Sequence, residues 1–379
     1  MLSILLIVVQ IVLAFFIASS LYLIGIYYLK ISLGSIQKHT ETTNKKNHHF
    51  AIVFNDYINE ESLLEQIQFL TNQSYTNFSA YFFIDTPYVT GNNMSHIRII
   101  RPLQKRLGKF GLLNLSKNYF ADTTEAILVL DPGAHLSDNY LHEMNTCLCQ
   151  GFRVIQSDVQ IDPSQQKTHV YQVFAKKFNN FIDRKVHQAS GISSALWNQG
   201  FVIHASLFEK LNFDSYTNSD KVLQAELITR SEKIAYATKA RLIERAYSSK
   251  EMFKQKQKWY QQYFFNYHLG FNLFLEGIKN PNIEKIIFGF NFMRPPLMIM
   301  FLASISLATI DLLWLPEFVF FFWLSALGLI TSLFLLYKPE KLFSYIYSVK
   351  SFWITLFAVP KKTNKKNVDK ILNHPNFAR

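Results

Sequence analysis

The sequence predicts an α/β domain held between apolar segments that are long enough to cross a membrane. Apolar residues gather at the two ends of the 379-residue chain, whereas the middle alternates short apolar runs with segments of helical periodicity. Charged residues make up 17 % of the chain, which is low for a fully soluble protein. The length suits one large domain plus membrane segments.

The N-terminal apolar segment, residues 2–29, contains no charged side chain and exceeds the roughly 20 residues that span a bilayer. Basic residues follow this segment instead of preceding it, which favours an uncleaved anchor over a signal peptide. Near the other end, residues 296–314 and 318–337 form two apolar runs separated by a short Leu-Pro-Glu turn. We therefore expect a transmembrane helical hairpin, with Asp311 and Glu317 near its turn and no polar pair at mid-depth in the spans.

The net charge indicates which surface the chain meets. Lysine and arginine exceed aspartate and glutamate by 12, and many of the lysines flank the apolar segments. This placement favours an anionic membrane surface over nucleic acid as a partner, because the chain contains no nucleic-acid-binding motif.

The lysines also predict an orientation. Basic residues follow the first span, precede the second and follow the third, so the positive-inside rule places residues 30–294 in the cytoplasm. We expect residues 342–359 to form an interfacial helix, because a fourth span would carry the lysine-rich tail outside. The sequence thus predicts a multi-pass protein of the cell (inner or plasma) membrane.

The middle of the chain predicts a mostly parallel sheet with helices between its strands. Strands are expected at residues 49–54, 78–84, 96–100, 126–130 and 153–157, and helices at 60–71 and 111–120. Asn59 is a suitable N-cap for the first helix. Asp85 and Asp131 each directly follow a strand, at the end where open α/β sheets bind ligands.

Eight short segments, in a fixed order, carry a family resemblance. They are Asn59-Glu60-Glu61 after the first strand, Asn72 to Phe78, Ile84-Asp85-Thr86-Pro87, Gly108 to Asn114, Leu130-Asp131-Pro132-Gly133, Asn198-Gln199-Gly200, Ser219-Asp220 with Arg230 and Ile234-Ala235-Tyr236, and Gln255 to Trp259. Together they resemble the motifs of family-2 glycosyltransferases with the GT-A fold, above all the membrane-bound hyaluronan, chitin and cellulose synthases. The resemblance covers residues 49–260.

The resemblance implies a division of the chain into six parts. These are a transmembrane anchor (1–29), a linker (30–48), a GT-A domain (49–275), a juxtamembrane segment (276–294), a transmembrane hairpin (295–337) and an interfacial helix with a basic cytoplasmic tail (338–379).

The resemblance also implies a reaction. A sugar would pass, with inversion, from a nucleoside-diphosphate sugar to a membrane-proximal glycan or lipid-linked acceptor, with Mg²⁺ or Mn²⁺ as cofactor and partner subunits in the membrane as candidates. The resemblance implies that Asp220 is the general base. It implies that Asp85, Lys109 and Asp131 bind the donor and that Asp131 is also the metal ligand. The acceptor and diphosphate path would be lined by Gln255, Lys258 and Trp259. The chemistry suits these types, because cations neutralise the departing diphosphate and a carboxylate can accept the acceptor's proton.

Three positions depart from the family pattern and keep an alternative open. Gly133 replaces the second acid of the metal motif, Ser219 replaces the acid before Asp220, and Lys258 replaces an arginine. A catalytically silent relative that scaffolds a polysaccharide-assembly complex would tolerate such changes, whereas the retained Asp131 and Asp220 favour an enzyme. Both acids also have plainer interpretations, a turn and a helix cap. A transporter is a weaker third alternative.

The cysteines and histidines do not predict a metal site. Cys147 and Cys149 lack further ligands nearby and are interpreted as residues of a helix. His142, His187 and His204 do not have metal-ligand spacing and are interpreted as structural residues.

Overall fold

The structure is a computed structural model that describes residues 2–34, 46–85, 96–102, 107–165, 169–213, 220–295, 297–314, 319, 322–323 and 326. The chain forms two compact units. A helical unit comprises residues 1–36, 167–182 and 249–359, and a sheet unit comprises residues 37–166, 183–248 and 360–379. Each unit is described by itself.

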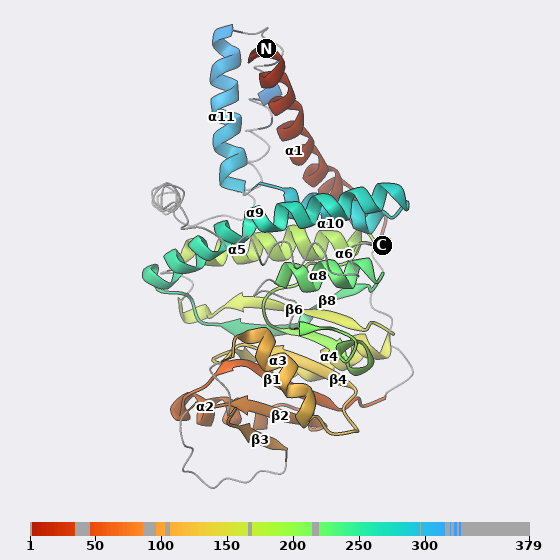
Figure 1. Ribbon diagram of the computed structural model, residues 1–379, viewed down its shortest axis with the longest axis vertical. Coiled ribbons are helices and arrows are strands. Elements are labelled where there is room, and N and C mark those ends of the chain that lie inside the picture. Colours follow the sequence, from red (N-terminus) through yellow and green to blue (C-terminus); the bar gives the residue numbers. More distant parts are fainter. Residues whose placement is uncertain are drawn as a thin grey trace. The chain divides into compact units, whose positions relative to one another are not determined.

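The sheet unit is built on eight strands in the order β3-β2-β1-β4-β7-β6-β8-β5 (Figure 1). The strands are β1 (Phe50–Tyr57), β2 (Phe78–Phe83), β3 (Ile97–Ile100), β4 (Ala126–Leu130), β5 (His135–Leu136), β6 (Val154–Ile161), β7 (Phe201–His204) and β8 (Ile234–Glu244). β3, β2, β1 and β4 are parallel, as the sequence predicts. β7 is antiparallel to both β4 and β6, and β5 is antiparallel to β8, so the sheet is mixed.

Short helices connect these strands. They are α2 (Glu60–Thr71), α3 (Lys109–Ser116), α4 (Tyr140–Cys149), α6 (His187–Ala189), α7 (Ala205–Phe208) and α8 (Asp220–Thr229), with 3₁₀ turns at Lys117–Tyr119 and Pro163–Gln165 and a π-helical turn at Phe181–Val186. α2 begins where the sequence predicts, because the Asn59 side chain accepts a hydrogen bond from the Ser62 amide. Its apolar face buries Leu63, Ile67 and Leu70.

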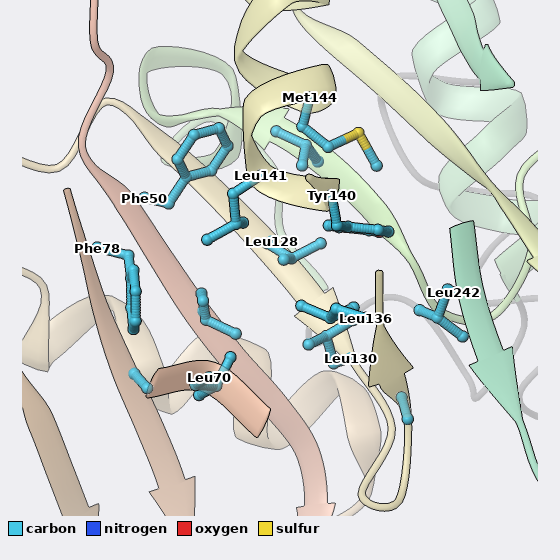
Figure 2. Close-up of a cluster of buried hydrophobic side chains, with 14 of the residues drawn as sticks. Phe50, Leu70, Phe78, Leu128, Leu130, Leu136, Tyr140, Leu141, Met144 and Leu242 are labelled. Atoms are coloured by element: carbon cyan, nitrogen blue, oxygen red, sulfur yellow. The ribbon is translucent and has the colours of Figure 1, made fainter. Parts of the chain in front are cut away.

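The core of the sheet unit lies between α4 and the parallel strands (Figure 2). Phe50, Leu128 and Leu130 from the strands are fully buried against Leu141 and Met144 of α4. Each such side chain contributes roughly 1.5–3 kcal/mol relative to an exposed one. This packing holds the strand ends that carry the polar residues described below.

The helical unit contains α1 (Leu2–Ser32), α5 (Val170–Asn180), α9 (Ser249–Lys279), α10 (Ile283–Met293) and α11 (Leu297–Trp314). Among the described residues one helix, over Leu6–Ser32, is long and apolar enough to cross a membrane. A signal sequence and the core helix of a soluble protein have the same length and apolar composition. The second arm of the expected hairpin (318–337) lies largely outside the described residues, and the expected interfacial helix (342–359) lies wholly outside them.

A polar pair joins two helices of the helical unit, at the Asp311 that the sequence places near the turn of the expected hairpin. The Gln10 side-chain nitrogen on α1 donates to Asp311 Oδ1 on α11 at 2.8 Å, and Asp311 is fully buried. Trp323 Nε1 in turn donates to Gln10 Oε1 at 3.4 Å. The partners are 301 residues apart in the sequence, so no local pattern could reveal the pair.

Candidate functional site

Polar residues gather where the parallel strands end. Phe54 of β1 lies opposite Leu130 of β4, so Asn55, still within β1, and Asp131, directly after β4, come next on two neighbouring strands. Asp85 follows β2, the other neighbour of β1, and its side chain is exposed. The predicted placement of Asp85 and Asp131 beyond strand ends is therefore confirmed.

The segment before β7 holds Asp131 in place. The Asn198 side-chain nitrogen donates to Asp131 Oδ2 at 3.0 Å. The Asp131 backbone amide donates to Gln199 Oε1 at 3.2 Å, and Gln199 Nε2 donates to Glu244 Oε2 at 2.8 Å. Glu244 is the last residue of β8, so three separate parts of the chain meet at Asp131.

A glycine fixes the course of this segment. Gly200 has φ +69°, and a Cβ on it would lie 2.4 Å from Ser157 Oγ. Its amide donates to the Val129 carbonyl at 2.8 Å, and its carbonyl accepts from the Ser157 amide at 2.8 Å. Only glycine combines this backbone conformation with so close an approach, which places Asn198 and Gln199 beside Asp131.

Lys109 links Asp220 to the segment that contacts Asp131. It begins α3, and its Nζ donates to Asp220 Oδ1 at 2.5 Å and to the carbonyl of Asn198. Asp220 is the first residue of α8. Lys109 and Asp220 are 111 residues apart, yet the fold brings them into one ion pair, linked through Asn198 to Asp131. Three of the predicted site residues thus lie together.

The electrostatics single out Asp131. Burial raises the pKa of the Asp131 carboxyl from 3.8 to about 6, and the negative charges of Asp220 and Glu244 add to the rise. The Lys109 ammonium and the Asn55 side chain oppose it. Three carboxylates and one ammonium leave this site with an excess of negative charge.

The site offers a divalent cation a single carboxylate of the metal motif, Asp131. The second position of the metal motif is Gly133, at φ +82°, and no group of three or more His, Cys, Asp or Glu side chains converges within the described part of the chain. However, Asp131 lies among an excess of negative charge, which attracts a cation. The site therefore suits a cation that one carboxylate holds and donor phosphates complete.

The residues predicted along the acceptor and diphosphate path belong to the helical unit. Gln255, Lys258 and Trp259 lie on α9 in the helical unit, and their side chains are outside those described, so their roles stay predictions. Sequence reasoning missed Asn55 and Glu244. Asn55 lies within β1 but directly follows the apolar run predicted as a strand at residues 49–54, which is a signal that could have identified it.

The interpretation of the two cysteines is confirmed. Both lie on α4 as free thiols, and burial raises the pKa of Cys147 to about 12, which makes this thiol unreactive. His187 is fully buried, and the His204 side chain caps α7 by accepting from the Ser206 amide.

The comparison with known proteins finds a similarity of fold but not of sequence. No protein-family model and no curated protein sequence matches the chain. Mannosyltransferase PcManGT from Pyrobaculum calidifontis, solved in complex with GDP-Man and Mn2+, superposes with a TM-score of 0.54 over 93 % of this chain and 99 % of that chain, at 10 % identity. TarS 1–349 from S. aureus matches 55 % of this chain and 63 % of that chain with a TM-score of 0.37 and 10 % identity. The superposition on PcManGT shows that the chain shares the fold of that glycosyltransferase.

Proposed function

We propose that the protein is a membrane-bound inverting glycosyltransferase that moves a sugar from a nucleoside-diphosphate sugar to a membrane-proximal glycan or lipid-linked acceptor. The observation that supports this most is the continuous contact from Asp131 through Asn198 and Lys109 to Asp220. It lies at the carboxyl ends of strands in a glycosyltransferase fold, where such sheets bind ligands.

In the proposed reaction the acceptor hydroxyl oxygen bonds to the anomeric carbon of the sugar. The bond from that carbon to the diphosphate oxygen breaks, and its electron pair leaves with the diphosphate. Attack from the side opposite the leaving group inverts the anomeric configuration. Asp220 accepts the proton of the hydroxyl, because a carboxylate within hydrogen-bond reach can act as general base.

The donor side of the site supplies positive charge and orientation. Lys109 carries the ammonium of the site and pairs with the diphosphate as negative charge develops on it. A divalent cation bound with the donor supplies further charge neutralisation. Asp131 would hold that cation, and the exposed Asp85 would contact the nucleoside.

The sequence is the basis for the proposed membrane location, and also for the proposed acceptor path. Multi-pass insertion in the cell membrane, with the catalytic domain in the cytoplasm, follows from the lysines that flank the apolar segments. Cysteine labelling in intact cells tests it: we expect label on single cysteines in the sheet unit and the C-terminal tail only after the membrane is opened. Labelling of the tail from outside would refute three spans.

A silent scaffold is the second candidate, and one observation favours it. Gly133 leaves the metal motif with a single acid and has a backbone conformation, φ +82°, that side chains rarely adopt. A scaffold would have the fold without donor affinity.

Donor binding separates the two candidates. We expect one member of a panel of guanosine- and uridine-diphosphate sugars to raise the unfolding temperature of the full-length protein in detergent, with Mn²⁺ or Mg²⁺ present. The corresponding sugar-free nucleoside monophosphate serves as the control. Absence of any stabilisation, with every sugar and either metal, would leave the scaffold as the better description.

The Asp220→Asn variant tests the catalytic role. Asparagine keeps the shape but cannot accept the proton, so we expect turnover to fall roughly 10²- to 10⁴-fold while donor affinity is unchanged or stronger. The exposed Asp122→Asn variant is the matched control. Retained turnover in Asp220→Asn would reduce this residue to the start of a helix.

A further inference from the structure

A third acid near Asp131 has no assigned role. Glu244 ends β8 and is 7 % exposed. Its backbone is fixed, because it pairs with Ile161 of β6 and its carbonyl accepts from the Asp162 amide at 2.9 Å. A buried carboxylate in so rigid a place requires a hydrogen-bonding partner.

Gln199 is that partner, and it faces Asp131 with its other end. Its Nε2 donates to Glu244 Oε2, while its Oε1 accepts from the Asp131 amide. These two bonds determine which way the Gln199 amide points, because a carboxylate can only accept and a backbone N–H can only donate. The Glu244 carboxylate is therefore one amide group away from the Asp131 backbone.

The charge of Glu244 reaches the site. Its carboxylate and the Asp131 backbone lie at opposite ends of the same Gln199 amide, so the charge lies close to Asp131. Asp220, the other acid near Asp131, is paired with Lys109 at 2.5 Å.

The metal motif itself lacks this charge. Gly133 stands where the family pattern has a second acid, and the space around a Cβ at this position is open to 4 Å. The motif segment therefore contributes a single carboxylate, and the second negative charge comes from another strand.

We propose that Glu244 is the second acid of the donor site: through Gln199 it is a positioning residue for Asp131, and it supplies the negative charge that Gly133 does not. Its target is a divalent cation bound with a nucleoside diphosphate. The inference rests on the proposed function. It predicts opposite effects of the charge on two forms of the donor, because a negative charge attracts a cation–diphosphate complex and repels a bare diphosphate.

Calorimetric titration of guanosine and uridine diphosphates, each with MnCl₂ or with EDTA, tests the inference on the full-length protein in detergent. Glutamine at position 244 can still accept from Gln199. We expect Glu244→Gln to weaken binding with Mn²⁺ by about tenfold and to strengthen binding in EDTA. Glu232→Gln is the matched control, since Glu232 is also partly buried and accepts from a side chain, Arg153 Nη1 at 2.7 Å.

A rescue variant separates charge from structural damage. Gly133→Asp in the Glu244→Gln background should restore much of the Mn²⁺-dependent affinity, whereas Gly133→Asn, with the same backbone strain, should not. Equal weakening with and without Mn²⁺, or no rescue by aspartate, would overturn the assignment of Glu244. If the parent protein binds neither diphosphate under any condition, the proposed function fails together with it. If the parent binds and Glu244→Gln is unchanged, only the role of Glu244 fails.

Discussion

Asparagine in place of Asp131 should make the protein more stable at neutral pH while it removes the proposed metal ligand. In the folded chain burial raises the pKa of this carboxyl from 3.8 to about 6. The folded state therefore binds the proton more tightly than the unfolded chain, and the difference corresponds to roughly 3 kcal/mol. Asparagine keeps an oxygen that can accept from Asn198.

The sign of the pH dependence follows from the raised pKa. Well below pH 3.8 the carboxyl is neutral in both the folded and the unfolded chain and does not lower the free energy of unfolding. As the pH rises towards the folded pKa of about 6, the unfolded chain loses its proton first, so stability falls. Above that pKa the whole penalty is present. The advantage of Asp131→Asn should thus grow between these two pH values and then level off.

Urea unfolding of the full-length protein in detergent measures this. At pH 7 the midpoint of Asp131→Asn should exceed that of the parent by roughly 1 M, and at pH 5 by about half as much. Asp138→Asn, at an exposed position after β5, is the control and should shift little at either pH. A variant that is less stable than the parent at pH 7, or a difference that does not change with pH, would refute the account of the Asp131 environment.

Two further predictions concern the framework. Gly200→Ala should lower the free energy of unfolding by more than Gly151→Ala does. Both positions have positive φ, but only at Gly200 would a Cβ lie 2.4 Å from another atom. Thermal unfolding of the two variants should differ by roughly 1–3 kcal/mol in the free energy of unfolding. In the helical unit, Gln10→Leu should destabilise the protein in detergent by roughly 1–3 kcal/mol because it leaves the buried Asp311 without a donor, and adding Asp311→Leu should recover most of the loss. A double variant no better than Gln10→Leu alone would show that the hydrogen bond is not the source of the effect.

Local patterns in the sequence predicted the elements whose signals are local. The strand at residues 126–130 and the helix at 60–71 have the predicted bounds, because an uninterrupted apolar run and an Asn cap with a periodic apolar face identify them. The sheet's mixed character was not predictable in this way. β7 has four residues, and its direction depends on the conformation of Gly200.

The residues of the candidate site also differ in whether a local sequence pattern identifies them. Lys109, Asp131 and Asp220 were identifiable because each belongs to a recognisable motif, and the structure brings them together. Glu244 belongs to no motif, and its contact with Gln199 spans 45 residues. Only the folded chain reveals such a contact.

The stability cost of Asp131 also bears on the choice between enzyme and scaffold. In a scaffold the carboxyl would serve no reaction, and exchanging it for asparagine would remove a penalty of roughly 3 kcal/mol, a large part of the 5–15 kcal/mol that stabilises an ordinary domain. The surrounding residues relieve this penalty only in part, through Lys109 and Asn55. Asp220 and Glu244 increase it, and the ammonium of Lys109 is shared with Asp220. An arrangement that concentrates negative charge around a partly buried acid is costly for folding and useful for binding a cation–phosphate complex, which favours the enzyme.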